Sequence, residues 1–118
     1  MKNQPFPKKL RNAFAGIRYV WEHENNFRLQ IVLGFVTLAA FILIQPAALW
    51  WGLITLCVTL VLVAELVNSA IEMLIDHLHP EFHAVVGKVK DMLAGMVLVM
   101  SVGAAIVAMI AVYATLFA

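Results

Sequence analysis

Long runs of apolar residues dominate the chain and predict three helices that cross a membrane. The first run lies at 27–44, where about 18 residues give roughly 27 Å of α-helix, close to the thickness of a bilayer core. The Gln45-Pro46 pair ends this run in a tight turn, because proline cannot continue a helix. The second span is expected at 47–77 and the third at 86–116, with a short polar loop between them.

The N-terminal part of the chain has a different pattern. Apolar side chains recur there at intervals of three and four residues, at Leu10, Phe14, Ile17 and Trp21. With basic residues on another face, this spacing predicts an amphipathic helix at about 8–24 that lies in the headgroup region of the membrane. Residues 1–7 hold two prolines and no periodicity, so we expect a flexible arm followed by a single domain at 8–118.

Composition supports an all-α membrane protein with three transmembrane helices and an N-terminal amphipathic interfacial helix. Of the 118 residues, 64% are hydrophobic and 13% are charged, whereas soluble proteins are about 25% charged. The single cysteine, Cys57, lies in an apolar run, which excludes an intrachain disulfide and a cysteine metal cluster. Basic residues are too few for a nucleic-acid surface and flank apolar spans, so no nucleic-acid partner is expected.

The positions of lysine and arginine predict the orientation in the membrane. All eight lie before residue 29 or at Lys88 and Lys90, and the Gln45-Pro46 turn has none. Because cytoplasmic segments are enriched in these residues, we expect the N-terminus and the loop near 77–87 in the cytoplasm. We also expect a homo-oligomer, because polar groups at membrane depth need partners that three helices alone do not supply.

The end of the second apolar run carries three acids and an amide on one side of a helix. At about 100° per residue, Glu72 and Asp76 each lie roughly 20° from Glu65, and Asn68 lies about 60° away. Carboxylates at membrane depth are costly in free energy unless a cation, a metal ion or water meets them. We therefore take these four residues, the acid stripe, as the candidate working site.

Other polar groups are expected at the same membrane boundary, namely Glu24, Arg28 and Lys90-Asp91. Carboxylates that hold Mg²⁺, a lysine beside phosphate and a carboxylate that takes a hydroxyl proton suit phosphoryl transfer. A proton or ion path through an oligomer explains the same acids about as well, and a non-catalytic assembly subunit is a third alternative. The sequence has no GxxxxGK or GxGxxG loop, so neither standard nucleotide cradle is expected.

The acid stripe is part of a longer pattern. Its segments are Glu65-Leu66-Val67-Asn68-Ser69-Ala70-Ile71-Glu72, Asp76, Glu81-Phe82-His83 and Gly87-Lys88-Val89-Lys90-Asp91-Met92, with Gly16-Ile17-Arg18, Trp21 and Glu24-Asn25-Asn26-Phe27-Arg28 upstream. Over about residues 10–115 this pattern resembles the prokaryotic diacylglycerol kinase and undecaprenol kinase family. The resemblance implies a homotrimer of the bacterial inner membrane, with shared active sites, that uses MgATP to phosphorylate a lipid alcohol at the cytoplasmic leaflet. The favoured acceptor is diacylglycerol, giving phosphatidic acid, and undecaprenol is the alternative.

The resemblance also implies roles for single residues. Glu65 would be the general base on the lipid hydroxyl, Glu24 and Glu72 the Mg²⁺ ligands, and Asp76 a supporting residue. The nucleotide would contact Glu24, Asn68, Glu72, Glu81, Phe82, His83, Lys90 and Asp91. The lipid substrate would contact Glu65, Arg18, Trp21 and Arg28.

A few positions depart from the family pattern. Asn12 stands where many members have an aromatic residue, and Gln30 where some diacylglycerol-type members carry an acid. Leu93-Ala94 replaces a Gly-Ser pair of that branch, while Pro80-Glu81-Phe82-His83 is closer to the undecaprenol branch. The identity of the lipid acceptor is therefore open.

Overall fold

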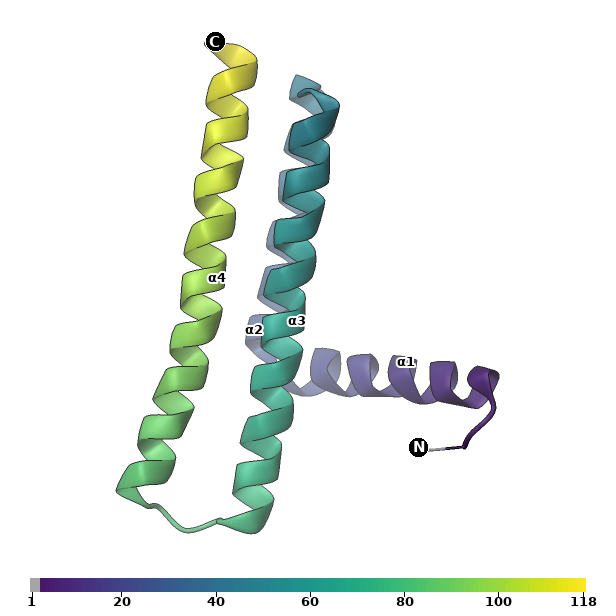
Figure 1. The fold of residues 1–118 in the computed structure, drawn as a ribbon, viewed down its shortest axis with the longest axis vertical. Helices are drawn as coiled ribbons and strands as arrows, with labels where there is room; N and C mark the ends of the chain where they lie inside the picture. The colour runs from purple at the N-terminus through teal and green to yellow at the C-terminus, as the bar shows by residue number, and fades with distance from the viewer. Residues whose placement is uncertain (1–2) are drawn as a thin grey trace.

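A computed structural model describes residues 3–118 of the chain, which fold into four helices (Figure 1). These are α1 (Phe6–His23), α2 (Asn25–Ile44), α3 (Ala48–Leu78) and α4 (Ala84–Leu116). Helices α2, α3 and α4 are each long and apolar enough to cross a membrane. The all-α membrane fold with three spans is confirmed.

Helix α1 lies roughly perpendicular to the three spans (Figure 1). It begins at Phe6, two residues before the expected start, because Pro5 and Pro7 suit a helix N-terminus, where proline's missing N–H is harmless. Met1 and Lys2 of the expected arm lie outside the described residues. The apolar side chains at Leu10, Phe14, Ile17 and Trp21 are 41% to 64% exposed. Leu10, Phe14 and Trp21 lie on the face that an interfacial helix would bury in lipid, and Ile17 lies at the edge of that face.

A single residue, Glu24, makes the corner between α1 and α2. Its backbone is extended, with φ −120° and ψ 110°, and its N–H donates to the carbonyl of Val20 at 2.8 Å. Helix α2 therefore starts at Asn25, before the expected residue 27. The corner fixes an acidic side chain at the point where the interfacial helix meets the first span.

The α2–α3 connection is the tight turn that the sequence predicts. Gln45 adopts the left-handed conformation (φ 52°), and its side-chain amide donates to the carbonyl of Ile42 at 2.7 Å. The two helices then approach closely at Gly34, where an added Cβ would lie 3.1 Å from Cγ1 of Val58. Near the turn, Phe41, Ile54 and Ala111 form the most deeply buried cluster.

Helices α3 and α4 run antiparallel, and both extend past the level of α1 (Figure 1). At 31 residues α3 is about 46 Å long, which exceeds a bilayer core of about 30 Å. Its last turns, which carry the acid stripe, therefore reach the level of α1 and continue beyond it. Helix α4 begins at Ala84, two residues before the expected start, because the Nδ1 atom of His83 accepts from the N–H of Val85 at 3.1 Å.

Candidate active site

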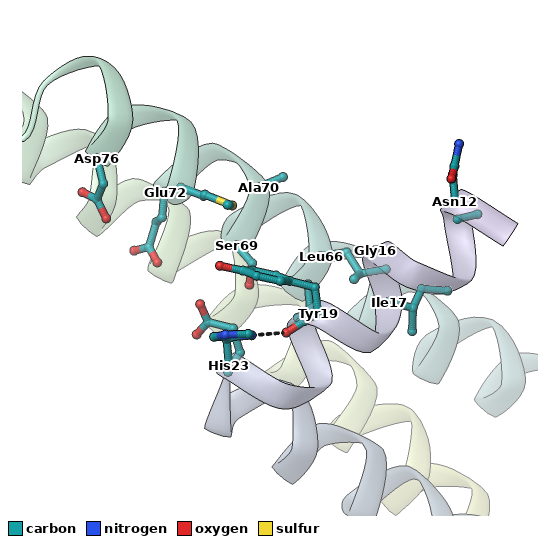
Figure 2. A pocket seen from close by; sticks show the side chains of 14 residues that line it. Asn12, Gly16, Ile17, Tyr19, His23, Leu66, Ser69, Ala70, Glu72 and Asp76 are labelled. Atoms are coloured by element: carbon teal, nitrogen blue, oxygen red, sulfur yellow. Dashed lines mark hydrogen bonds between the residues drawn. The ribbon is translucent and has the colours of Figure 1, made fainter. Parts of the chain in front are cut away.

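Where α1 crosses α3, the two helices enclose a cleft of about 660 Å³ (Figure 2). Residues three and four positions apart lie on one face of a helix, and each helix contributes such a series. The α1 side consists of Asn12, Ala13, Gly16, Ile17, Tyr19, Val20 and His23, with Glu24 at its end. The α3 side consists of Leu66, Ser69, Ala70, Glu72, Met73 and Asp76. We call this space the α1–α3 cleft.

Three carboxylates from two elements line the α1–α3 cleft. Glu72 and Asp76 lie one turn apart on α3, toward the α3–α4 loop, and the corner after α1 brings Glu24 to them. Like charges in a partly enclosed cleft repel, and their repulsion is relieved by a cation. The acid stripe thus meets Glu24, as the sequence predicts.

Glu65 lies deeper than the acids that line the cleft. Its side chain is only 3% exposed, and it interacts electrostatically with Glu24 and Glu72. The side-chain amide of Gln30 faces the same carboxyl group and also donates to Oγ of Ser101 at 3.1 Å. Gln30, one of the departures from the family pattern, therefore connects this carboxyl group to α4.

An ion pair joins the acid stripe to α4. Nζ of Lys90 donates to Oδ1 of Asp76 at 2.6 Å, and the two side chains are 36% and 62% exposed. The lysine is therefore held at the end of the stripe that is nearest to the α3–α4 loop. A cation in this position can neutralise a phosphate group that enters from the loop side.

Asn68 and Ser69 each bury an oxygen atom that has no hydrogen-bond partner among the described residues. These atoms are Oδ1 of Asn68 and Oγ of Ser69. Buried polar atoms are nearly always paired, so an unpaired one in a site indicates a ligand, water or another subunit. Sequence reasoning selected Asn68 but not Ser69, which lines the α1–α3 cleft.

The remaining nucleotide candidates lie outside the α1–α3 cleft. Glu81, Phe82 and His83 occupy the α3–α4 loop, where Phe82 is 91% exposed, and Asp91 is exposed on α4. Their contact with a nucleotide stays a prediction.

The proposed lipid contacts on α1 and α2 also lie outside the cleft. Arg18 pairs with Glu22 at 2.8 Å on an exposed face, Trp21 is 41% exposed, and Arg28 donates to Oδ1 of Asn25. Their contact with a lipid substrate stays a prediction as well.

The apolar pattern of the sequence did not predict the face of α1 that lines the cleft. Ala13, Gly16 and Val20 follow helical spacing, but two of them are small and give a weak hydrophobic signal. Tyr19 and His23 also belong to this face, and their rings stack with centroids 4.0 Å apart. The large apolar side chains at Leu10, Phe14, Ile17 and Trp21 gave the stronger periodic signal in this part of the sequence.

Two carboxylates of the cleft have the chemistry that a Mg²⁺ ion shared with phosphate oxygens requires, and a Mg²⁺ site here stays a prediction. Among residues 3–118, no group of three or more His, Cys, Asp or Glu side chains could hold a metal ion. Mg²⁺ is commonly bound by one or two carboxylates together with phosphate oxygens and water, so a full protein cage is not needed. Glu24 and Glu72, which line one cleft from two elements, match that donor set.

A family model and several known proteins that are similar to this chain are all described as diacylglycerol kinases. The family model described as "Prokaryotic diacylglycerol kinase" matches residues 11–112. The chain is 34% identical to a diacylglycerol kinase of Helicobacter pylori strain J99 over 85 residues, which cover 72% of this chain and 66% of that protein. It is 32% identical to a Synechocystis diacylglycerol kinase over 83% of this chain and 57% of that protein. It is 31% identical to the Escherichia coli K12 diacylglycerol kinase over 74% of this chain and 71% of that protein. The match thus spans slightly less than two thirds of the Helicobacter protein.

Proposed function

This chain belongs to the prokaryotic diacylglycerol kinase family, and on this premise we propose that it transfers the terminal phosphoryl group of MgATP to a membrane lipid alcohol. The proposed acceptor is diacylglycerol and the product is phosphatidic acid. The observation that carries the proposal is the meeting of Glu24, Glu72 and Asp76 in one cleft at the level of the interfacial helix, with Lys90 bound to Asp76. The names of the relatives supply the acceptor class.

The residues of the acid stripe act on different reacting groups at successive positions along α3. Glu65 accepts the proton of the lipid hydroxyl, whose oxygen forms a bond to the γ-phosphorus. The bond from that phosphorus to the β,γ-bridging oxygen breaks, and ADP leaves with the electron pair. Glu65 is the deepest of the acids, and Asp76 with Lys90 is nearest to the loop. A lipid therefore approaches from the membrane side and the phosphates from the loop side.

Charge neutralisation is the main task of the other residues. Glu24 and Glu72 would hold Mg²⁺, which offsets phosphate charge and aligns the reacting oxygens when bound. Lys90 binds a phosphate oxygen and exchanges its contact with Asp76 for that contact. Asn68 hydrogen-bonds to the bound nucleotide with the side chain whose Oδ1 has no partner among residues 3–118.

The active form is a homotrimer in the bacterial inner membrane, with the α3–α4 loop in the cytoplasm. The clustering of lysine and arginine before residue 29 and at Lys88 and Lys90 supports this orientation. Helix α4 packs on α3 and α2 and leaves most of its surface uncovered within one chain, which supports assembly with further copies. Neighbouring subunits then share each active site.

Transfer of labelled phosphate tests the proposal. Purified protein in mixed micelles is supplied with γ-labelled ATP, Mg²⁺ and either diacylglycerol or undecaprenol. The proposal predicts labelled phosphatidic acid that disappears when Mg²⁺ is chelated. A folded preparation that labels neither lipid overturns it, and labelling of undecaprenol alone overturns the proposed acceptor.

A further inference from the structure

Ser69 buries a hydroxyl group that the described part of the chain leaves unpaired. The residue is 8% exposed, and its Oγ has no hydrogen-bond partner. A buried hydroxyl without a partner is costly in free energy. Other helical hydroxyls in the same protein avoid this cost, because Thr37 donates to the carbonyl of Leu33 at 2.9 Å and Thr59 to that of Thr55 at 2.8 Å.

The unpaired hydroxyl belongs to the α1–α3 cleft. Figure 2 shows Ser69 on the side of α3 that faces Tyr19 and His23 of α1, between Leu66 and Glu72. Among the residues of α3 that line the cleft, the apolar Leu66 lies toward the membrane and the carboxylates begin one turn closer to the loop. Glu65, one turn toward the membrane, lies deeper than this lining. Ser69 therefore lies at the boundary between the apolar and the acidic parts of the cleft.

The position of Ser69 along α3 indicates which ligand atom it meets. It lies one turn from Glu65 on one side and from Glu72 on the other, at axial distances of about 6 Å and 4.5 Å. The reacting hydroxyl lies between these two acids if the proposed reaction is right. An oxygen on the neighbouring carbon atom of the same acceptor would then come within reach of Ser69.

Diacylglycerol and isoprenoid alcohols, the two classes of lipid acceptor, differ at the carbon atom next to the one that bears the reacting hydroxyl. In diacylglycerol the carbon next to the hydroxyl-bearing carbon carries an acyl ester, whose carbonyl oxygen accepts hydrogen bonds. An isoprenoid alcohol has the reacting hydroxyl as its only polar group and would leave the Ser69 hydroxyl unpaired. Phosphate oxygens of the nucleotide also accept hydrogen bonds and meet the reacting hydroxyl during transfer. A change from ester to ether in the acceptor leaves the phosphates intact and therefore separates the two possible partners.

We propose that Ser69 is a specificity-determining residue that donates a hydrogen bond to the acyl ester carbonyl of a glyceride acceptor. The inference rests on the proposed function and extends it, because it assigns the preference for a glyceride over an isoprenoid alcohol to one side chain. A site built to hydrogen-bond a substrate discriminates against an analogue that lacks the matching group.

A cycle of enzyme and substrate changes tests this directly. Wild-type protein and Ser69→Ala are each assayed with 1,2-dioctanoylglycerol and with its diether analogue, which lacks the carbonyl groups. Either change alone should lower kcat/KM by about threefold to tenfold, the loss of one neutral hydrogen bond. Both changes together should cost no more than one, because they remove the same interaction. Losses that multiply instead overturn the inference.

Selectivity and rescue give a second measurement. The ratio of kcat/KM for the glyceride to kcat/KM for undecaprenol should fall in Ser69→Ala, and it should stay near the wild-type value in Ser69→Thr, which keeps the hydroxyl. Thr59→Val is the matched control, since it removes a hydroxyl from the same helix that is already paired. An equal loss toward both acceptors in Ser69→Ala contradicts the inference.

Thermal stability without lipid substrate separates ligand binding from a structural role. Ser69→Ala should melt at or above the wild-type temperature, because an unpaired buried hydroxyl is removed. A lower melting temperature would mean that another subunit pairs with Ser69, and it would overturn the inference. The wild-type assays distinguish the two failures: no labelled lipid refutes the proposed kinase, whereas labelled lipid without an ester effect refutes only the role of Ser69.

Discussion

At the scale of single residues, the main physical problem is how a buried carboxylate is tolerated. Glu65 is 3% exposed, and it has two other acids and an amide, Gln30, near it. Burial of such a charge is costly in free energy unless a nearby cation or a bound proton neutralises it. Its position beside Glu24 and Glu72 indicates that the three acids act together. The sequence predicted from helical spacing that Glu65 and Glu72 share one face of a helix, and it predicted Glu24 at the same membrane boundary.

Glu65→Gln should keep the shape of the side chain and remove its basicity. We expect kcat to fall by at least about a hundredfold, as for the loss of a general base, while the oligomer elutes at the wild-type position. Phosphate transfer and size-exclusion chromatography on the same preparation check this. Activity close to wild type would show that another group accepts the proton.

The Asp76–Lys90 pair should matter for nucleotide binding more than for stability. Exposed ion pairs contribute little to folding, so Asp76→Asn should leave the melting temperature nearly unchanged. Lys90→Gln should lower kcat/KM for ATP by at least about tenfold, because it removes a charged hydrogen bond to phosphate. Thermal unfolding tests the prediction for Asp76→Asn, and kinetics at varied ATP concentration test the prediction for Lys90→Gln. Wild-type values for Lys90→Gln would exclude the lysine from the site.

At the scale of helices, the apolar runs and the Gln45-Pro46 turn determine most of the fold. The observed ends differ from the expected ones by one or two residues, because local caps such as His83 and the corner at Glu24 set them. The crossing of α1 over α3 was not predictable, since Ala13 and Gly16 on the face of α1 that forms it give a weak hydrophobic signal. The unpaired hydroxyl of Ser69 was equally hidden, because pairing depends on neighbours that only the fold defines.

The close approach of α2 and α3 should make Gly34 sensitive to size. Gly34→Leu should destabilise the protein by about 1–3 kcal/mol, the usual range for overpacking, because even a Cβ atom would meet Val58 at 3.1 Å. Gly52→Leu is the matched control, since nothing lies within 4 Å of its added Cβ. Thermal unfolding in detergent compares the two. Equal melting temperatures would mean that α2 and α3 are not tightly packed there.

At the scale of the whole molecule, the account requires one orientation in the membrane. The interfacial helix, the acid stripe and the α3–α4 loop lie toward one end, and the α2–α3 turn lies at the other (Figure 1). ATP reaches the acids only if that first end is cytoplasmic. The distribution of lysine and arginine predicts this from the sequence alone.

Thiol labelling of intact cells measures the orientation. In a Cys57→Ala background, Ala47→Cys should react with a membrane-impermeant maleimide added outside. His79→Cys should react only after permeabilisation. Both residues are exposed, so accessibility in the fold is matched between them. The opposite labelling pattern would place the acids on the wrong side of the membrane.

The dependence of phosphate transfer on Mg²⁺ concentration tests whether the acids of the α1–α3 cleft hold the ion, as proposed. Glu72→Gln should raise the Mg²⁺ concentration for half-maximal transfer by at least about tenfold. Glu22→Gln, an equal charge change on an exposed face of α1, should keep the wild-type midpoint. An unchanged midpoint in Glu72→Gln would contradict the account.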